Sequence, residues 1–245
     1  MFNITKLLSI VTLLIVWQFA SIIGDNTVFP SLLDISINFK EHLIDGDLIK
    51  NLLITLKRVL ITFFITLFIG IVFGILMGVS KRVNDALDYL LVLGLNIPAL
   101  VIVVICFIWF GLSDFAALLA VILNKVPIVI VNIREGTRTI EQKYMQLAKV
   151  YKVGRKEVLF KVFLPQIYPY IMASTRLSLS LIWKIVLVVE LLGLSSGVGF
   201  SISMFFQFFD ITSILSYSLA FIFVIIAIEY FVLKPLEARI NFWKN

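Results

Sequence analysis

Six apolar runs, each long enough to cross a bilayer as a helix, constrain this 245-residue chain more than any other feature. A helix needs about 20 predominantly apolar residues to cross the hydrocarbon core. The runs lie at about 7–24, 52–79, 87–110, 115–133, 167–193 and 212–233. With 61% hydrophobic residues and a mean hydropathy of +1.08, the chain is far more apolar than soluble proteins, in which about half of the residues are apolar. We therefore expect an all-α, polytopic membrane protein with six transmembrane helices.

The basic residues orient the chain in the membrane, because cytosolic loops carry an excess of Lys and Arg. With both termini cytosolic, the cytosolic segments hold most of the 21 basic residues, namely Lys6, Lys81, Arg82, Arg134, Arg138, Lys143, Lys149, Lys152, Arg155, Lys156, Lys161, Lys234, Arg239 and Lys244. The outer segments and the outer edge of the second helix hold only Lys40, Lys50, Lys57 and Arg58. Topology therefore explains the net charge of +6, and we expect the lipid bilayer as a partner and no nucleic acid.

Several kinds of chemistry lack the residues that they need. His42 is the only histidine, which excludes His-based triads, His-rich metal sites and His proton relays. There is no phosphate-binding loop of the G-x-x-x-x-G-K-[ST] type, so we do not expect the chain to hydrolyse ATP itself. The single cysteine, Cys106, leaves no intrachain disulfide. We expect no metal, no cofactor and no enzymatic activity.

Glycines and prolines indicate how the helices pack and bend. Gly70, Gly74 and Gly78 recur every four residues in the second helix, so they share a face that a neighbouring helix can approach closely. Pro98 and Pro127 lie in the third and fourth helices, where each frees a backbone carbonyl. We expect close packing at the glycines and kinks at the prolines.

The fifth helix carries a polar stripe along an otherwise apolar sequence. At about 100° per residue, five polar or amphipathic residues project within an arc of roughly 120°. They are Arg176, Ser180, Trp183, Lys184 and Glu190. Because a charge at mid-membrane costs about 2.5 to 3.5 kcal/mol, these residues should face the bundle interior, a water-filled path or each other.

Two interpretations of this stripe stay open. In the first, Arg176 reaches the cytosolic interface, and Lys184 and Glu190 tie helices together. Lys125 of the fourth helix is then a candidate partner of Glu190. In the second, the charged residues of the stripe line a substrate path.

The longest cytosolic loop, between the fourth and fifth helices, is predicted to be helical. From 141 to 153 its sequence places Tyr144, Leu147, Ala148 and Tyr151 on one face, at i, i+3, i+4 and i+7. We expect Gly154 to end this helix in a left-handed C-cap, a short helix to follow at 155–163, and Pro165 to close the unit. The apolar face would lie either on lipid headgroups or in a groove of a cytosolic protein.

The loop resembles the E-A-A-x-x-x-G motif of the integral-membrane subunits of bacterial binding-protein-dependent ABC importers. In that family Leu-Pro follows some thirteen residues after the glycine, and Leu164-Pro165 occupies that place here. Gln146, Leu147 and Ala148 then stand at the E-A-A positions. Lys152 falls where the glycine belongs, and Gly154 comes two residues later.

Other short motifs resemble the nitrate, sulfonate and taurine branch of the family, in the same order along nearly the whole chain. They are Phe29-Pro30-Ser31, Leu56-Lys57-Arg58-Val59-Leu60, Ile97-Pro98-Ala99, Trp109-Phe110-Gly111, Ser174-Thr175-Arg176-Leu177, Val188-Val189-Glu190 and Gly197-Val198-Gly199-Phe200.

The resemblance implies a type I ABC importer permease-like fold in a bacterial inner membrane. It implies three protein partners: a second permease subunit, expected to be a second copy, a cytosolic ATP-binding subunit, and an extracellular solute-binding protein. Residues 1–50 would form the first transmembrane helix and an outer segment, and 51–245 the permease core with a coupling loop at about 134–165. The expected ATPase-coupling residues are Tyr144, Gln146, Leu147, Ala148, Tyr151, Gly154, Leu164 and Pro165, and the expected substrate-path residues are Arg176, Lys184, Glu190 and Lys125.

Two other classes of membrane protein remain as alternatives. An ion-coupled secondary transporter or channel would also have six spans, buried charges and basic loops, but it would need no ATPase and no long helical loop. A membrane enzyme is disfavoured, because no nucleophile, base or metal ligands converge in the sequence. The basic residues suit an anionic solute, although related subunits also serve vitamin precursors.

Overall fold

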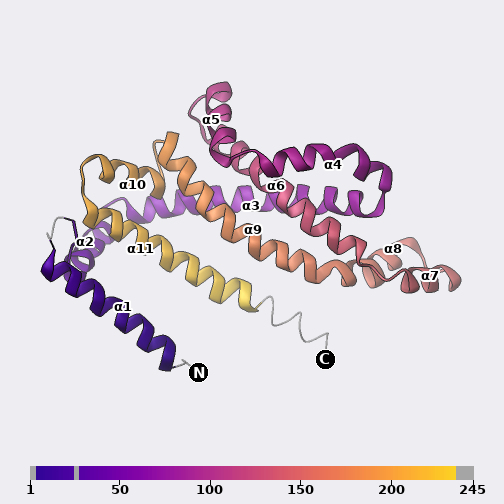
Figure 1. Ribbon diagram of the computed structural model, residues 1–245, viewed down its shortest axis with the longest axis horizontal. Helices are drawn as coiled ribbons and strands as arrows, with labels where there is room; N and C mark the ends of the chain where they lie inside the picture. The colour runs from indigo at the N-terminus through magenta and orange to yellow at the C-terminus, as the bar shows by residue number, and fades with distance from the viewer. Residues whose placement is uncertain (1–3, 25–27, 236–245) are drawn as a thin grey trace. The chain divides into compact units, whose positions relative to one another are not determined.

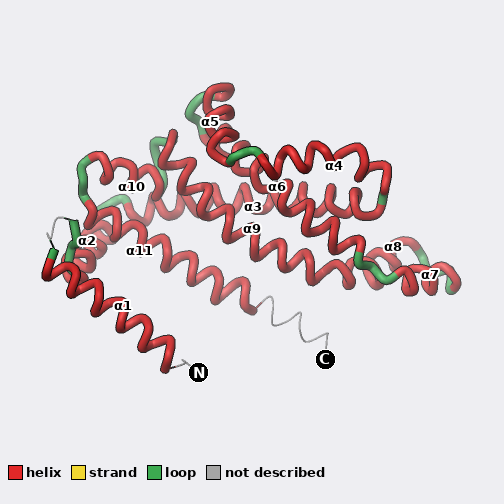
Figure 2. Tube along the Cα trace, viewed as in Figure 1, coloured by secondary structure: helices red, strands yellow, loops and turns green. Residues whose placement is uncertain are grey.

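The computed structural model describes residues 4–24 and 28–235, and this part of the chain is helical without a strand (Figure 2). The elements are α1 (Ile4–Ile23), α2 (Leu32–Ile44), α3 (Leu48–Val79), α4 (Lys81–Asn96), α5 (Ala99–Phe110), α6 (Asp114–Arg138), α7 (Gln142–Val150), α8 (Arg155–Glu157), α9 (Leu164–Gly193), α10 (Val198–Gln207) and α11 (Ile211–Ile228), with two π-helical segments, η1 (Val158–Phe163) and η2 (Glu229–Leu233). Figure 1 follows these elements along the chain. The expected all-α fold is confirmed.

Three of the described helical segments are long and apolar enough to cross a bilayer alone. They are α3, α6 and the segment Ile211–Phe231, which contains α11. Two bent pairs, α4 with α5 and Arg155–Gly193 with α10, raise the number of candidate spans to as many as five. In α1 only the shorter stretch Val11–Ile23 passes as an apolar helix. The exact number of six spans therefore stays a prediction, and two of the expected cytosolic cations, Arg239 and Lys244, lie outside the described residues.

The third predicted helix, 87–110, consists of two helices. α4 ends at Asn96, α5 begins at Ala99, and the two differ in direction by 97°. Pro98 is the cause, because a proline ring disfavours helical geometry in the residue before it, and Ile97 is accordingly extended with a ψ of 125°. The expected kink at Pro98 is thus a full break, whereas α6 continues through Pro127 as one helix.

The chain packs as two compact units. Residues 57–189 form a continuous unit, and residues 1–56 combine with 190–245 to form the other. α3 and α9 each contribute to both units. The division into 1–50 and 51–245 made above is functional, and it stays a prediction.

In the continuous unit, α6 is the helix on which several others pack. A side-chain carbon added at Gly70, Gly74 or Gly78 of α3 would collide with Val129, Ile133 or Thr137 of α6, respectively. The predicted close approach at the three glycines is therefore confirmed, and the facing helix is α6. Gly136 of α6 lies against the ring of Tyr170 in α9 in the same way.

Two sets of contacts join the helices of the same unit: a buried apolar cluster and an ion pair at the start of α6. Met77 of α3, Leu91 of α4 and Ile130 of α6 are buried together. At the start of α6, the Asp114 carboxylate accepts hydrogen bonds from Arg58 Nε at 2.9 Å and Nη2 at 2.6 Å. Arg58 is only 6% exposed, so this charge is stabilised by a direct ion pair with α6.

In the discontinuous unit, α2 packs on α11. α2 begins with a capping box, in which Ser31 Oγ accepts from the Asp34 N–H and the Asp34 carboxylate accepts from the Ser31 N–H. Asn38 Nδ2 donates to Ser213 Oγ of α11 at 3.2 Å. α1 is tied to the start of α2 by Trp17 Nε1, which donates to the Pro30 carbonyl at 3.1 Å.

Candidate functional site

The first helix of the loop between α6 and α9 forms as the sequence predicts. α7 runs from Gln142 to Val150, and its face at i, i+3 and i+4 consists of Tyr144, Leu147 and Ala148, followed by Tyr151 at the C-cap. Ala148 is buried against the segment that follows, while Tyr144, Leu147 and Tyr151 are 48%, 52% and 74% exposed. The helix thus presents large apolar side chains without covering them.

The turn after α7 corrects the prediction for Gly154. The residue in the left-handed region is Lys152, with a φ of +49°, whereas Gly154 is extended with a φ of −63° and precedes α8. The N–H of Val153 donates to the Ala148 carbonyl at 2.9 Å, and the N–H of Lys152 donates to the Lys149 carbonyl at 3.1 Å. These two bonds make a Schellman motif with Lys152 at the position that usually carries glycine. The left-handed residue of this turn is therefore Lys152, at the position where the E-A-A-x-x-x-G pattern has glycine.

We expect Lys152→Gly to stabilise this turn by about 1 kcal/mol, because a left-handed conformation costs a side-chain-bearing residue about 1–2 kcal/mol. Amide exchange of Val153, whose N–H closes the turn, should slow about fivefold. Lys156→Gly, at an exposed helical position of α8, serves as the control and should speed local exchange. Unchanged or faster exchange of Val153 in Lys152→Gly would show that the turn carries no strain.

Pro165 does not close the loop as predicted. α8, η1 and α9 follow one another without a break from Arg155 to Gly193, and Pro165 lies in the first turn of α9. There its missing N–H leaves out one helical hydrogen bond, and the chain widens into the π-helical segment η1 just before it. The Gln166 side chain instead ties this turn to the start of α7: its Nε2 donates to the Val162 carbonyl at 2.9 Å, and its Oε1 accepts from the Glu141 N–H at 3.0 Å.

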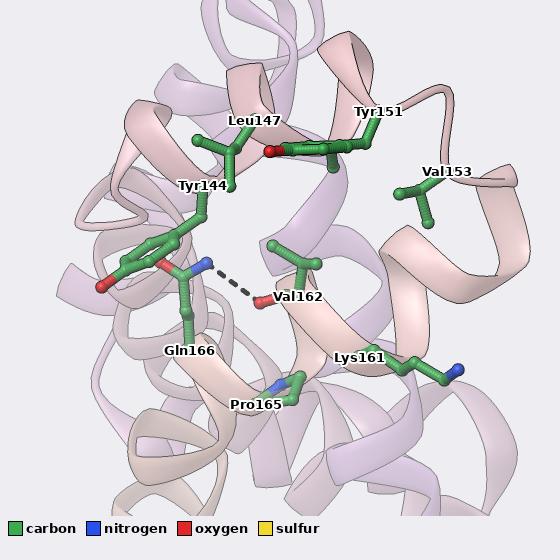
Figure 3. A pocket seen from close by; sticks show the side chains of 9 residues that line it. Tyr144, Leu147, Tyr151, Val153, Lys161, Val162, Pro165 and Gln166 are labelled. Carbon is green, nitrogen blue, oxygen red and sulfur yellow. Dashed lines mark hydrogen bonds between the residues drawn. The ribbon is translucent and has the colours of Figure 1, made fainter.

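A pocket of about 410 Å³ lies between α7 and the segment that follows it. We call it the loop pocket; it is lined by Tyr144, Leu147, Ala148, Tyr151, Val153, Lys161, Val162, Pro165 and Gln166. Figure 3 shows the side chains of α7 on one side of this space and those of Val162, Pro165 and Gln166 across from them. The four apolar residues predicted for the face of α7 therefore line one pocket, together with Pro165.

The end of α6 is fixed where the loop begins. Arg134 Nη1 donates to Asp88 at 2.6 Å and to Asn84 at 3.2 Å, and both acceptors belong to α4. Arg138 Nη2 also donates to Asn84, at 2.7 Å, and both arginines bond Glu135. The Arg134 side chain is only 13% exposed. This network holds the base of the loop to α4 as well as to α6, and Figure 1 shows α7 and α8 at this end of α6 and α9.

Glu190, one of the predicted path residues, is buried with hydrogen-bonding partners. Its carboxylate is 1% exposed and accepts from Thr55 Oγ1 of α3 and from the Gly199 N–H of α10, each at 2.9 Å. A carboxylate at a helix N-terminus is stabilised by the unpaired N–H groups there. These contacts favour the first interpretation, in which Glu190 ties helices together; its place in a substrate path stays a prediction.

Two residues of α3 complete this helix start. Asn51 Oδ1 accepts the Gly197 N–H at 3.0 Å, and Thr55 Oγ1 accepts the Val198 N–H at 2.9 Å. The first N–H groups of α10 are thus bound by side chains of α3 and α9. Gly197 itself has a φ of +104°, and a Cβ there would collide with the Glu190 carboxylate. We call Asn51, Thr55 and Glu190 the α10 cap.

The other three predicted path residues belong to the continuous unit. Arg176 and Lys184 are exposed on α9, and Lys125 is half-buried in α6. Arg176, Ser180 and Lys184 follow at four-residue intervals and are all exposed, so the polar stripe is present on this part of α9. Glu190 lies in the other unit, and the structure therefore does not gather the four residues in one described site.

Sequence reasoning missed Gln166, the α10 cap residues of α3 and the helix α2. The Ser31-x-x-Asp34 pattern could have indicated the start of α2, because it is a capping-box signature. Nothing local marks Asn51 or Thr55 as capping residues, since their partners lie about 140 positions away in the sequence. Gln166 is likewise an ordinary polar residue until α7 is placed beside it.

A family model matches residues 70–233, and its description reads "Binding-protein-dependent transport system inner membrane component". The chain is 31% identical over 232 residues to the aliphatic sulfonates transport permease protein SsuC of Bacillus subtilis, covering 94% of this chain and 84% of that one. It is 26% identical over 203 residues to the taurine transport system permease protein TauC of Escherichia coli, covering 83% and 74%.

The fold has a counterpart among solved structures. A chain of the MetNI methionine ABC transporter in an inward-facing conformation superposes with a TM-score of 0.59 at 14% identity, over 75% of this chain and 93% of that one. The relatives are transport permeases, so the prediction of a multi-pass membrane transport subunit rather than an enzyme is confirmed. The chain belongs to the family of inner membrane components of binding-protein-dependent transport systems, in the branch of the sulfonate and taurine ABC importer permeases.

Proposed function

We propose that the chain docks an ATP-binding subunit through α7 and forms, with a second copy of itself, the path for a small solute that an extracellular binding protein delivers. Membership of the family implies an ATP-binding and a solute-binding partner. The pairing of two copies and the cytosolic position of both termini are further parts of the proposal. The cytosolic position of the termini rests on the basic residues of the α4 start and of the 134–161 segment, which the positive-inside rule assigns to the cytosol.

The observation that carries the docking proposal is the exposed apolar surface around the loop pocket. Tyr144, Leu147 and Tyr151 are about half or more exposed. They lie at the end of the continuous unit, where Arg134 bonds α6 to α4 and Gln166 bonds α9 to the start of α7. Large apolar side chains on a water-facing loop indicate a surface that another protein covers. A loop held rigidly at its base can pass a displacement of its partner to α4, α6 and α9.

The docking proposal is tested by purifying the chain in detergent and reconstituting it in proteoliposomes. We expect an ATP-binding subunit to co-purify, and we expect uptake to require both ATP and the extracellular binding protein. Uptake that is driven by an ion gradient without an ATP-binding subunit would contradict the proposal and favour a secondary transporter.

For the path, we propose that Arg176 and Lys184 line it and that Lys125 lies along it. Arg176, Ser180 and Lys184 are exposed on one face of α9. In an apolar chain such polar side chains need water, solute or a protein partner beside them, because contact with lipid is costly. The names of the two relatives refer to aliphatic sulfonates and taurine, and sulfonate groups are anionic. Cations on α9 and the chemistry of those solutes both support a small anionic solute.

We expect Lys184→Gln to lower uptake about tenfold, because a hydrogen bond to a charged group contributes about 1.5–3 kcal/mol. ATPase stimulation by the binding protein should stay within about twofold, since Lys184 lies outside the coupling loop. Lys50→Gln, which removes an exposed cation on the outer side, is the control and should leave both activities unchanged. Equal losses of uptake and ATPase stimulation in Lys184→Gln would instead indicate a structural ion pair.

A further inference from the structure

The coupling loop carries positive charge that its own carboxylates do not neutralise. Five exposed basic residues of the loop have no ion-pair partner among the residues that the structure describes: Lys143, Lys149, Lys152, Arg155 and Lys156. Lys161 differs from them, because its Nζ lies 2.9 Å from the Glu157 carboxylate. The cations of α7 and α8 are therefore available to a partner.

Two of these cations border a second pocket beside α7. This basic pocket, of about 530 Å³, is lined by Gln142, Met145, Gln146, Ala148, Lys149, Val153, Arg155 and Val158. It shares Ala148 and Val153 with the loop pocket, so the two pockets flank α7. Lys149 and Arg155 are its charged residues, and no carboxylate lines it.

Gln146 is the residue that leaves this pocket basic. It stands at the first position of the E-A-A pattern, where glutamate is expected, and it lines the same pocket as Lys149 three residues later. Side chains three apart on a helix are neighbours, so a glutamate at 146 would be placed to pair with Lys149 within the chain. The uncharged amide of Gln146 cannot form that pair.

We infer that the basic pocket receives a carboxylate side chain of the ATP-binding subunit, so that this loop selects an ATP-binding subunit whose docking surface is acidic. The inference rests on the proposed docking through α7 and adds the charge that the partner must carry. Complementary charge of this kind fixes partner choice and register as well as adding affinity.

The shape of the pocket favours a protein partner over lipid headgroups. Its lining comes from two segments, α7 and the stretch from Val153 to Val158, so Lys149 and Arg155 border one concave space. A helix that lies on a membrane needs one apolar side toward the acyl chains and cations along its margins. α7 instead has an apolar pocket on one side and a basic pocket on the other, which suits a partner that covers both.

The test is the substitution Gln146→Glu, which restores the residue of the family pattern. The ATP-binding subunit is identified by mass spectrometry in the purified transporter, produced separately and labelled with a fluorophore. It is then titrated against the chain in nanodiscs of neutral phosphatidylcholine. We expect Gln146→Glu to weaken its binding about fivefold, because the new carboxylate competes for Lys149 and Arg155. Gln146→Ala removes the amide without adding charge, so it should weaken binding less than Gln146→Glu does.

A charge-matched pair of double variants locates the effect. Lys149→Gln with Arg155→Gln should weaken binding about tenfold and reduce its salt dependence, whereas Lys143→Gln with Lys156→Gln removes the same charge outside the pocket and should have little effect. Three results would each overturn the inference: equal weakening by both pairs, unchanged or tighter binding of Gln146→Glu, or an effect that appears only in anionic phosphatidylglycerol nanodiscs. If Leu147→Asp also leaves binding intact, the docking proposal itself fails, and that outcome is distinct from failure of the charge inference alone.

Discussion

Replacing Leu147 or Tyr151 by aspartate is expected to reduce ATP-driven uptake to background while the chain remains inserted in the membrane. Both side chains are more than half exposed and line the loop pocket, so in the docked state they are the groups that a partner covers. An unpaired charge buried in such an interface costs about 3 kcal/mol or more, which corresponds to at least about a hundredfold loss of affinity. Uptake in proteoliposomes and co-purification of the ATP-binding subunit measure the effect.

The matched control is Val150→Asp. Val150 is 76% exposed on the same helix, but it lines neither the loop pocket nor the basic pocket. We expect this variant to dock and to transport close to wild-type levels. Normal ATP-driven uptake by both Leu147→Asp and Tyr151→Asp would refute the role of α7 in coupling, and loss in all three variants would point to a general effect of charge on the loop.

The second large effect is expected at the turn between α9 and α10, where Gly197→Ala should destabilise the protein by about 3 kcal/mol and lower its midpoint of thermal unfolding by about 10 °C. With a φ of +104° and a ψ of 172°, Gly197 occupies a region that other residues rarely enter. The added Cβ would also collide with the Glu190 carboxylate, which is buried and bonded to Thr55 and Gly199. Thermal unfolding in detergent and size-exclusion chromatography report the loss.

Two other glycines separate the contributions to this effect. Gly154→Ala should be neutral, because Gly154 is extended and nothing lies within 4 Å of an added Cβ. Gly111→Ala should show backbone strain alone, since Gly111 has a φ of +72° in open space. A Gly197→Ala variant that unfolds at the same temperature as Gly111→Ala would mean that the carboxylate moves aside at little cost.

Local sequence signals predicted the parts of the fold that depend on neighbouring residues. The four-residue spacing of Gly70, Gly74 and Gly78 predicted a close helix contact, and α6 makes it. The spacing of Tyr144, Leu147 and Tyr151 predicted their shared face, because helical periodicity alone decides it. Both predictions succeed since a regular helix fixes which residues share a side.

The errors arose where the presence of a glycine or a proline alone was used to predict where a helix or a loop ends. Gly154 was expected to take the left-handed conformation because glycine does so at the lowest cost, yet the hydrogen bonds from Val153 and Lys152 place it at Lys152. Pro165 was expected to end the loop, but the helix continues through it, with the π-helical segment η1 directly before α9. At Pro98 the kink was predicted correctly, but its angle of 97° depends on how α4 and α5 each pack against α6.

The α10 cap also constrains the order in which the chain can be built. Asn51 and Thr55 are synthesised some 140 residues before the N–H groups of Gly197 and Val198 that they bind. The intervening residues 57–189 form the continuous unit. The N-terminal polar groups must therefore find interim partners in water, lipid headgroups or the insertion machinery until α9 and α10 arrive. A ribosome stalled before residue 190 should leave α1, α2 and the first residues of α3 accessible to proteases or cross-linkers that the completed chain resists.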